Sequence, residues 1–328
     1  MHDGIILICG YQVEYIMTLR ALPVLLLLVL FSGCGRPVPR TTGPFEIFFS
    51  RKDDLPGKLV SLINSSQREI IMAAYEANLP SVLGALRNAE KRGVKVELLI
   101  DDLTVGDTAG LPSQVYTDRS SSSLMHAKFG VFDQKICWLG SCNLTFGSAY
   151  ESDNDLLLIR SPEIAGCLRE TFFCLTSGKT PLSSRIEGNR PLSIYFTPEC
   201  RPALLRELRK TESEIFFSLY VLTDPEVIKL LRQKAVAGIK IGGVLERSWP
   251  GNRPAFAALH SAGIAVRWDN NYNLNHYKVF ILDGRKVITG SYNPSRTAPE
   301  NQEILAVIAS PELAGIYQRR LSGRFGFF

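Results

Sequence analysis

The stretches HAKFGVFDQKICWLGSCN (126–143) and HYKVFILDGRKVITGSYN (276–293) decide how this 328-residue chain is organised. Both fit the pattern His-x-Lys-x4-Asp-x6-Gly-Ser-x-Asn, and the two histidines are 150 residues apart, at 126 and 276. Six specified positions that recur at identical spacing do not arise by chance. The sequence therefore predicts an internal duplication in which each half supplies one copy of the same site.

The segments before the two motifs repeat as well. Each half has an alternating apolar run, a second strand-like run, a helical stretch that ends at a glycine, and a third β-rich run: 45–50, 68–76, 79–93 and 94–102 in the first half, and 192–197, 213–221, 224–238 and 239–247 in the second. Alternation of strands and glycine-ended helices is typical of a covered sheet. We predict an α/β fold of two similar α/β/α halves, each with a mixed, mostly parallel sheet, and an active site at the interface between the halves.

The domain organisation follows from these repeats. We expect a signal peptide at 1–34, a Pro- and Gly-containing tether at 35–44, a first repeat at 45–175, a polar linker at 176–191 and a second repeat at 192–328. Hydrophobic residues make up 45% of the chain and charged residues 21%, which is typical of a globular protein and excludes a disordered chain.

The N-terminal segment has the pattern of a secretory leader. Arg20 precedes the apolar stretch 21–31, and small residues then lead to Cys34. This ending resembles a bacterial lipobox, which implies acylation of Cys34. We therefore expect an exported, membrane-anchored lipoprotein that faces the periplasm or the cell exterior. Whether the chain starts at Met1 or at Met17 stays open.

The motif residues suit phosphodiester chemistry. His and Lys two residues apart on one strand would face the same way, so each half would present an imidazole beside an ammonium. A phosphodiester needs a nucleophile, an acid for the leaving oxygen, and fixed donors for the charge that grows in the transition state. Two histidines can divide these tasks and two lysines can stabilise the charge, so no metal and no cofactor is expected.

The doubled motif resembles the HKD signature of the phospholipase D superfamily, whose members form a covalent phosphohistidine between two similar halves. The resemblance implies the catalytic set His126, Lys128, Asp133, His276, Lys278 and Asp283. Within it, His126 is implied as the nucleophile and His276 as the general acid and base, although the order of the two histidines stays open. Asp133 and Asp283 are expected to have a structural or long-range electrostatic role.

The resemblance also implies residues around the histidines. The expected phosphate-binding residues are Lys128, Asn143, Lys278, Asn293, Ser141 and Ser291. A carboxylate that orients each histidine is expected ten residues after each motif asparagine, which gives Asp153 in the first half and Glu303 in the second. Asp155 and Glu151 are alternatives to Asp153.

Three activities are compatible with this site. The first is hydrolysis of a phospholipid headgroup ester, which the expected membrane anchor favours. The second is an endonuclease that acts on DNA or RNA, which the net charge of +5 suits. The third is a phosphatidyl transfer of the cardiolipin-synthase kind. Because one chain carries both motifs, we expect a monomer. Beyond Cys34, an odd number of cysteines without a CxxC pair gives no reason to expect a zinc site.

Overall fold

Two eight-stranded sheets form the framework of the computed structural model, which describes residues 41–106, 110–118, 123–181, 184–186 and 192–325. All of these lie in one compact unit, Val38–Phe328. The first sheet has the order β1 (Thr41–Thr42), β2 (Phe45–Phe49), β9 (Asp155–Arg160), β7 (Ile136–Gly140), β6 (Phe129–Phe132), β3 (Glu69–Ala74), β4 (Lys95–Ile100) and β5 (Val115–Thr117).

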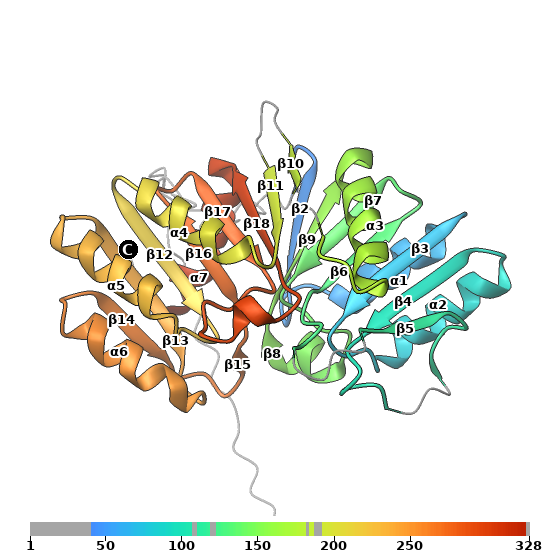
Figure 1. Ribbon diagram of the computed structural model, residues 1–328, viewed down its shortest axis with the longest axis horizontal. Coiled ribbons are helices and arrows are strands. Elements are labelled where there is room, and N and C mark those ends of the chain that lie inside the picture. Colours follow the sequence, from blue (N-terminus) through green and yellow to red (C-terminus); the bar gives the residue numbers. More distant parts are fainter. Residues whose placement is uncertain (1–40, 107–109, 119–122, 182–183, 187–191, 326–328) are drawn as a thin grey trace, which may run out of the picture. The chain divides into compact units, whose positions relative to one another are not determined.

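The second sheet repeats this order element by element (Figure 1). Its strands are β10 (Ser184–Ile186), β11 (Leu192–Phe196), β18 (Ile304–Ala309), β17 (Lys286–Gly290), β16 (Lys278–Leu282), β12 (Glu214–Leu219), β13 (Lys240–Glu246) and β14 (Ala265–Asp269). The predicted α/β class, the duplication and the mixed sheets are confirmed. Strand β1 falls within the expected tether, and β10 falls within the expected linker.

The prediction of mostly parallel sheets was wrong. Parallel pairing is confined to β3–β4–β5 and to β12–β13–β14, and the other neighbouring strands of the two sheets are antiparallel. The motif itself explains the difference, because each copy is a hairpin. Asp133–Gln134 and Asp283–Gly284 have positive φ at both positions, as the two central residues of a type I′ turn do, and such a turn joins antiparallel strands.

Helices cover the sheets in layers. Helices α1 (Leu55–Ser65) and α2 (Pro80–Lys91) pack on the outer face of the first sheet, and α4 (Cys200–Lys210), α5 (Pro225–Val236) and α6 (Arg253–His260) on that of the second. Between the inner faces, α3 (Pro162–Thr176) and α7 (Pro311–Phe325) join one shared core that contains residues of both halves. A shared core holds the two motif hairpins in a fixed relation.

Short pairings also cross from one half to the other, next to the motifs. Strand β15 (Leu274–Asn275) pairs in parallel with β8 (Ser152–Asp153), and an isolated bridge joins Met125 to Gln302. Each crossing ends immediately before a motif histidine. The duplication therefore places each histidine against a segment of the opposite half.

Several predictions concern segments or properties outside this core. The predicted leader and Cys34 lie outside the described residues. Among the helices that are described, none combines the length and the apolar character needed to cross a membrane. In the described part of the chain, four of the cysteines are free thiols: Cys137, Cys142, Cys174 and Cys200.

Candidate active site

His126 meets a carboxylate from the other half of the chain. Its backbone N–H donates to the carbonyl oxygen of Gln302 at 2.9 Å, and its Nδ1 lies 2.9 Å from both Oε1 and Oε2 of Glu303. The Glu303 side chain is 1% exposed, so little water screens this pair. A carboxylate accepts the hydrogen of Nδ1, which leaves Nε2 of His126 with its lone pair for chemistry.

His276 has the same backbone arrangement but a different side-chain partner. Its backbone N–H donates to Asp153 O at 3.0 Å, and its Nδ1 lies 2.8 Å from Oδ1 of Asn154. The amide Nδ2 of Asn154 donates to Ser148 O at 2.9 Å, which fixes Oδ1 toward the histidine. An amide oxygen can only accept, so His276 also carries its hydrogen on Nδ1, but opposite a neutral group.

The predicted role of Asp153 therefore falls to Asn154. In the sheets, Gly140 pairs with Leu156 and Gly290 pairs with Leu305, which makes Asn154 the counterpart of Glu303. The first-half connection is one residue longer than the second, and it contains the π-helix η2 (Gly147–Glu151), a form that accommodates an extra residue. Counting ten residues from each asparagine consequently misses by one.

The three carboxylates considered for His276 lie elsewhere. Asp153 is fully buried, with Oδ1 at 3.4 Å from Nη1 of Arg51. Asp155 Oδ1 accepts the backbone N–H of Ser141 at 3.1 Å, and Glu151 is exposed on η2. The side chain that meets Nδ1 of His276 is Asn154, so this half has an amide where a carboxylate was expected.

The two lysines point back toward the histidine of their own copy. Lys128 Nζ donates to the carbonyl oxygen of His126, and Lys278 Nζ donates to that of His276 at 2.8 Å. Both lysines are buried, and burial lowers the pKa of Lys128 to about 7 and the pKa of Lys278 well below its usual value. An arriving phosphate would restore their charge, because an anion favours the protonated form. The predicted single strand is shorter, since β6 begins only after Lys128 and β16 begins at Lys278.

The histidines influence each other electrostatically. Burial lowers the pKa of His126, and Lys128 and Lys278 add to this, whereas Glu303 opposes it. Burial lowers the pKa of His276 further, together with the charges of Lys278, Lys128 and His126. Both imidazoles are therefore largely neutral near pH 7 in the unliganded site, and they titrate as a coupled pair.

The Gly-Ser-x-Asn segments hold the strands and side chains that surround the histidines. A Cβ on Gly140 would lie 2.3 Å from Asp155 O, and a Cβ on Gly290 would lie 2.3 Å from Ile304 O, so only glycine allows this approach. Ser141 Oγ accepts the backbone N–H of Asp155 at 3.0 Å, and Ser291 Oγ donates to Glu303 Oε2. The serines hold the adjacent strands and, in the second half, the carboxylate.

The motif asparagines are placed to meet a ligand. Asn293 shares a cavity with His126, and it is buried with 9% exposure. Among the described residues, Oδ1 of Asn143 and Oδ1 of Asn293 have no hydrogen-bond partner. Buried amide groups normally have partners, so these two side chains are available to a substrate, and toward phosphate oxygens the donor would be the Nδ2 amide group.

The motif aspartates lie at the far end of the hairpins, in the turns. Asp133 accepts the backbone N–H groups of Gln67, Arg68 and Glu69 at 2.9, 2.8 and 3.0 Å. Asp283 accepts the equivalent backbone N–H groups of 212–214. Burial raises the pKa of each carboxyl, but these donors outweigh it and the pKa is lowered. Both aspartates tie a turn to the preceding strand.

Two tyrosines that the motif does not contain complete the site. The ring centroid of Tyr75 lies 5.7 Å from that of His126, and the ring of Tyr220 lies 4.9 Å from that of His276. The lysine of the same half lies over each tyrosine ring, at 5.6 and 5.0 Å. The repeat carried this signal, since both tyrosines follow directly on corresponding strands, REIIMAAYE (68–76) and SEIFFSLYV (213–221).

One carboxylate cluster could be considered for a metal ion. Asp101, Asp102 and Asp118 have oxygens within 4.8 Å of one another. Asp101 already accepts the backbone N–H of Met125 at 2.7 Å and that of Leu103 at 3.0 Å. The cluster thereby fixes the segment that leads to His126.

Comparison with known proteins agrees with this geometry. A family described as "Cardiolipin synthase, PLD-like domain" matches residues 59–175 and again 204–324, one copy in each half. Because the two matched segments cover more than half of the chain, this protein belongs to that phospholipase D-like family.

The individual relatives are more distant. A "Phospholipase D" of Rickettsia conorii is 33% identical over 132 residues, which cover 38% of this chain and 65% of the relative. A "Mitochondrial cardiolipin hydrolase" of Mus musculus is 25% identical over 132 residues, 39% of this chain and 58% of the relative. The chain thus spans about two thirds or less of the length of these relatives.

A solved structure extends the likeness of the fold to both halves. The phosphatidylserine synthase of Haemophilus influenzae Rd KW20 has a TM-score of 0.69 and 12% identity, with 87% of each chain covered. At this identity the likeness concerns the fold.

Proposed function

We propose that this protein cleaves phosphodiesters through a covalent phosphohistidine on His126, and that its substrates are phospholipids. One observation carries the proposal: two imidazoles lie close enough to influence each other's charge, and the Nδ1 of each is held by a residue of the opposite half. Both Nε2 atoms are thereby left for chemistry. The names of the Rickettsia and mouse relatives support a lipid as the substrate.

In the first step, the Nε2 lone pair of His126 attacks phosphorus. His276 acts from its protonated form, whose charge the anionic phosphate of the bound substrate stabilises. The bond from phosphorus to the leaving oxygen breaks, and this oxygen takes its electron pair together with the proton that His276 then carries on Nε2. The imidazole of His126 becomes positively charged, and Glu303 stabilises that charge. The neutral Asn154 offers no such stabilisation to His276, which therefore gives up its proton more readily.

In the second step, water attacks the phosphorus. A proton of this water goes to Nε2 of His276, the bond from phosphorus to His126 breaks, and its electron pair returns to Nε2 of His126. Lys128, Lys278 and the motif asparagines would hold the non-bridging oxygens in both steps. If an alcohol replaced water, the same intermediate would give phosphatidyl transfer.

The test uses an activated diester, bis(p-nitrophenyl) phosphate, whose leaving group needs no acid. His276→Ala should release one equivalent of nitrophenolate in a burst and accumulate an acid-labile phosphoryl label on His126, because water is no longer activated. His126→Ala should show neither burst nor label. Sustained turnover by His126→Ala would overturn the mechanism.

An endonuclease is the second candidate. The net charge of +5 favours it, as does the aromatic pair Tyr220 and Trp249, whose ring centroids are 5.7 Å apart and on which a base could stack. Parallel assays with phosphatidylcholine, cardiolipin and single-stranded DNA and RNA decide between the candidates. Faster cleavage of the nucleic acids would replace the lipid proposal.

The cell location is a separate proposal, which rests on the leader pattern alone. We propose that the protein is exported and held at a membrane by acyl chains on Cys34. Labelled palmitate should be incorporated by the wild type and not by Cys34→Ala, and an unlabelled wild type would contradict the anchor.

A further inference from the structure

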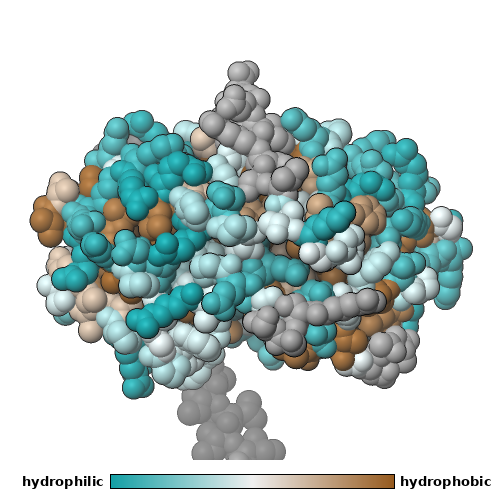
Figure 2. Space-filling model, viewed as in Figure 1, coloured by the Kyte–Doolittle hydropathy of each residue, from teal (hydrophilic) through white to brown (hydrophobic). Residues whose placement is uncertain are grey.

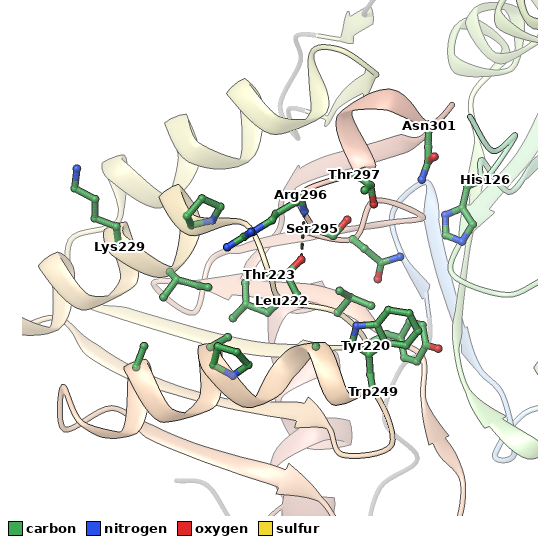
Figure 3. A pocket seen from close by; sticks show the side chains of 18 of the residues that line it. His126, Tyr220, Leu222, Thr223, Lys229, Trp249, Ser295, Arg296, Thr297 and Asn301 are labelled. Atoms are coloured by element: carbon green, nitrogen blue, oxygen red, sulfur yellow. Dashed lines mark hydrogen bonds between the residues drawn. The ribbon is translucent and has the colours of Figure 1, made fainter. Parts of the chain in front are cut away.

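A groove leads from the catalytic site into the second half. It has a volume of about 820 Å³ and runs between α5 and α6, with His126 at its inner end (Figure 3). Asn293 also lines it. Cavities that bind small molecules measure about 300–1,000 Å³. The groove is therefore large enough for part of a substrate whose phosphate lies at His126.

The walls of the groove are mainly apolar. The side chains come from the end of β12 and from the two helices: Val221, Leu222, Ile228, Pro254, Ala255 and Ala258. Near its inner end lie Tyr220 and Trp249, and Trp249 is 41% exposed (Figure 3). Covering an apolar wall with hydrocarbon lowers the free energy of the complex, because apolar surface is removed from water. The same wall has little to offer a sugar-phosphate backbone.

The charged residues that line the groove are all positive. Lys229, Arg232 and Arg296 are exposed, and among the described residues no aspartate or glutamate contributes to the lining. In the space-filling view, apolar residues lie between hydrophilic ones over the part of the second half where α4 and α5 lie (Figure 2). An apolar floor with a cationic rim matches a hydrocarbon chain that enters from an anionic lipid surface.

We propose that this groove binds one acyl chain of the substrate while the phosphate lies between His126 and His276. The inference rests on the proposed function and specifies its substrate: a phosphodiester is processed efficiently only when it carries a hydrocarbon chain on the side that is retained on His126. Because His126 and Asn293 line the same groove, we identify its occupant as a part of the substrate itself.

Neighbouring alanines on α6 allow a matched test. Ala258 is half-buried and lines the groove, whereas Ala257 is exposed and is not part of the lining. Ala258→Trp fills the groove, and Ala257→Trp adds the same side chain to the outer face of the same helix. Each is compared with the wild type on monomeric short-chain phosphatidylcholines of increasing chain length and on bis(p-nitrophenyl) phosphate, which has no chain.

The expected result is a chain-length dependence that only one variant loses. For the wild type and Ala257→Trp, kcat/KM should rise up to about fourfold for each added methylene that is buried. Ala258→Trp should flatten this rise, lose about tenfold or more on the longer chains, and retain wild-type rates on the chain-free diester.

Other outcomes separate the groove from the mechanism. An unchanged chain-length dependence in Ala258→Trp would overturn the groove while leaving the phosphohistidine mechanism intact. If Ala258→Trp instead impairs cleavage of single-stranded DNA, the groove holds a base and the acyl-chain assignment is wrong. A wild type that cleaves neither lipid nor chain-free diester would refute the proposed function itself.

Discussion

Glu303→Gln tests how the carboxylate on His126 contributes to catalysis. The substitution replaces the charged partner of Nδ1 by an amide, the kind of group that Asn154 already supplies to His276. The amide oxygen still accepts the Nδ1 hydrogen, so the tautomer of His126 is preserved. The change therefore isolates the charge of Glu303 from its positioning role.

The magnitude follows from the kind of hydrogen bond that is lost. A hydrogen bond to a charged group contributes about 1.5–3 kcal/mol and a neutral one about 0.5–1.5 kcal/mol, a difference of about 1–2 kcal/mol. This difference acts when His126 becomes positively charged, so kcat should fall by about 5- to 30-fold. A wrong tautomer would cost far more, about 10⁴-fold in a serine protease triad.

The pH profile gives a second measure. Glu303 raises the pKa of His126 against the effect of burial, so its loss lowers that pKa. His126 attacks only when it is neutral, and a lower pKa keeps it neutral to lower pH. The acid limb of kcat/KM on bis(p-nitrophenyl) phosphate should therefore move to lower pH.

Glu300→Gln is the matched control. Glu300 is exposed in the adjacent short helix η4 (Ala298–Glu300), and its substitution removes the same formal charge where water screens it. It should leave both the rate and the pH profile unchanged. The reasoning is refuted if Glu303→Gln behaves like Glu300→Gln, or if its acid limb moves to higher pH.

Further predictions concern the other half, the turn and the lysines. Asn154→Asp gives His276 a carboxylate, so its pKa should rise and one limb of the kcat/KM profile should move to higher pH; a profile with both limbs unchanged would exclude His276 as the acid. Asp133→Ala removes the acceptor of three backbone N–H groups, so it should lower the free energy of unfolding by about 1–3 kcal/mol in urea titrations, with kcat of the folded enzyme retained. Because burial places the pKa of Lys128 at about 7, inorganic phosphate should bind at pH 8 with proton uptake in calorimetry; Lys128→Met should reduce this uptake, and phosphate binding without it would contradict the assignment.

The same lysine predicts how stability depends on pH. The pKa of Lys128 is about 7 in the folded chain and near 10.5 when it is exposed, so between these values the unfolded chain binds more protons. Stability should therefore rise with pH across this window, to the extent that Lys128 contributes to it. This dependence should weaken in Lys128→Met.

Spacing along the sequence predicted what local geometry controls. From the repeat alone we could predict the two halves and the motif hairpins, with Asp133 and Asp283 in their turns. The repeat also marked the glycines at which strands approach closely. Glu303 lies against Nδ1 of His126, and the second-half connection has the length that the count of ten residues assumed. These features depend on residues within one hairpin and its return strand.

Features that depend on contacts with the other half could not be predicted from the sequence. Asn154 takes the place expected for Asp153 because the first-half connection has one extra residue, which a π-helix accommodates. Such an insertion leaves no mark in the spacing of apolar residues along the sequence. Strand direction was misjudged because βαβ alternation describes only part of each sheet. The tyrosines that flank the histidines carried a signal in the repeat, but one that becomes meaningful only when the strands are aligned.

The difference between Glu303 and Asn154 makes the two halves of the duplicated site unequal, because one histidine faces a carboxylate and the other faces an amide. The backbone frames match, since both histidines donate their backbone N–H across the halves and both lysines donate to the histidine carbonyl of their own copy. If these matching backbone contacts were the whole arrangement, either imidazole could attack the phosphorus. The buried carboxylate of Glu303 would stabilise the positive charge that His126 gains in the proposed intermediate, whereas the amide of Asn154 fixes the tautomer of His276 without stabilising a charge on it. Under the proposed mechanism, this single difference in charge between corresponding positions would make His126 the covalent carrier and His276 the proton donor.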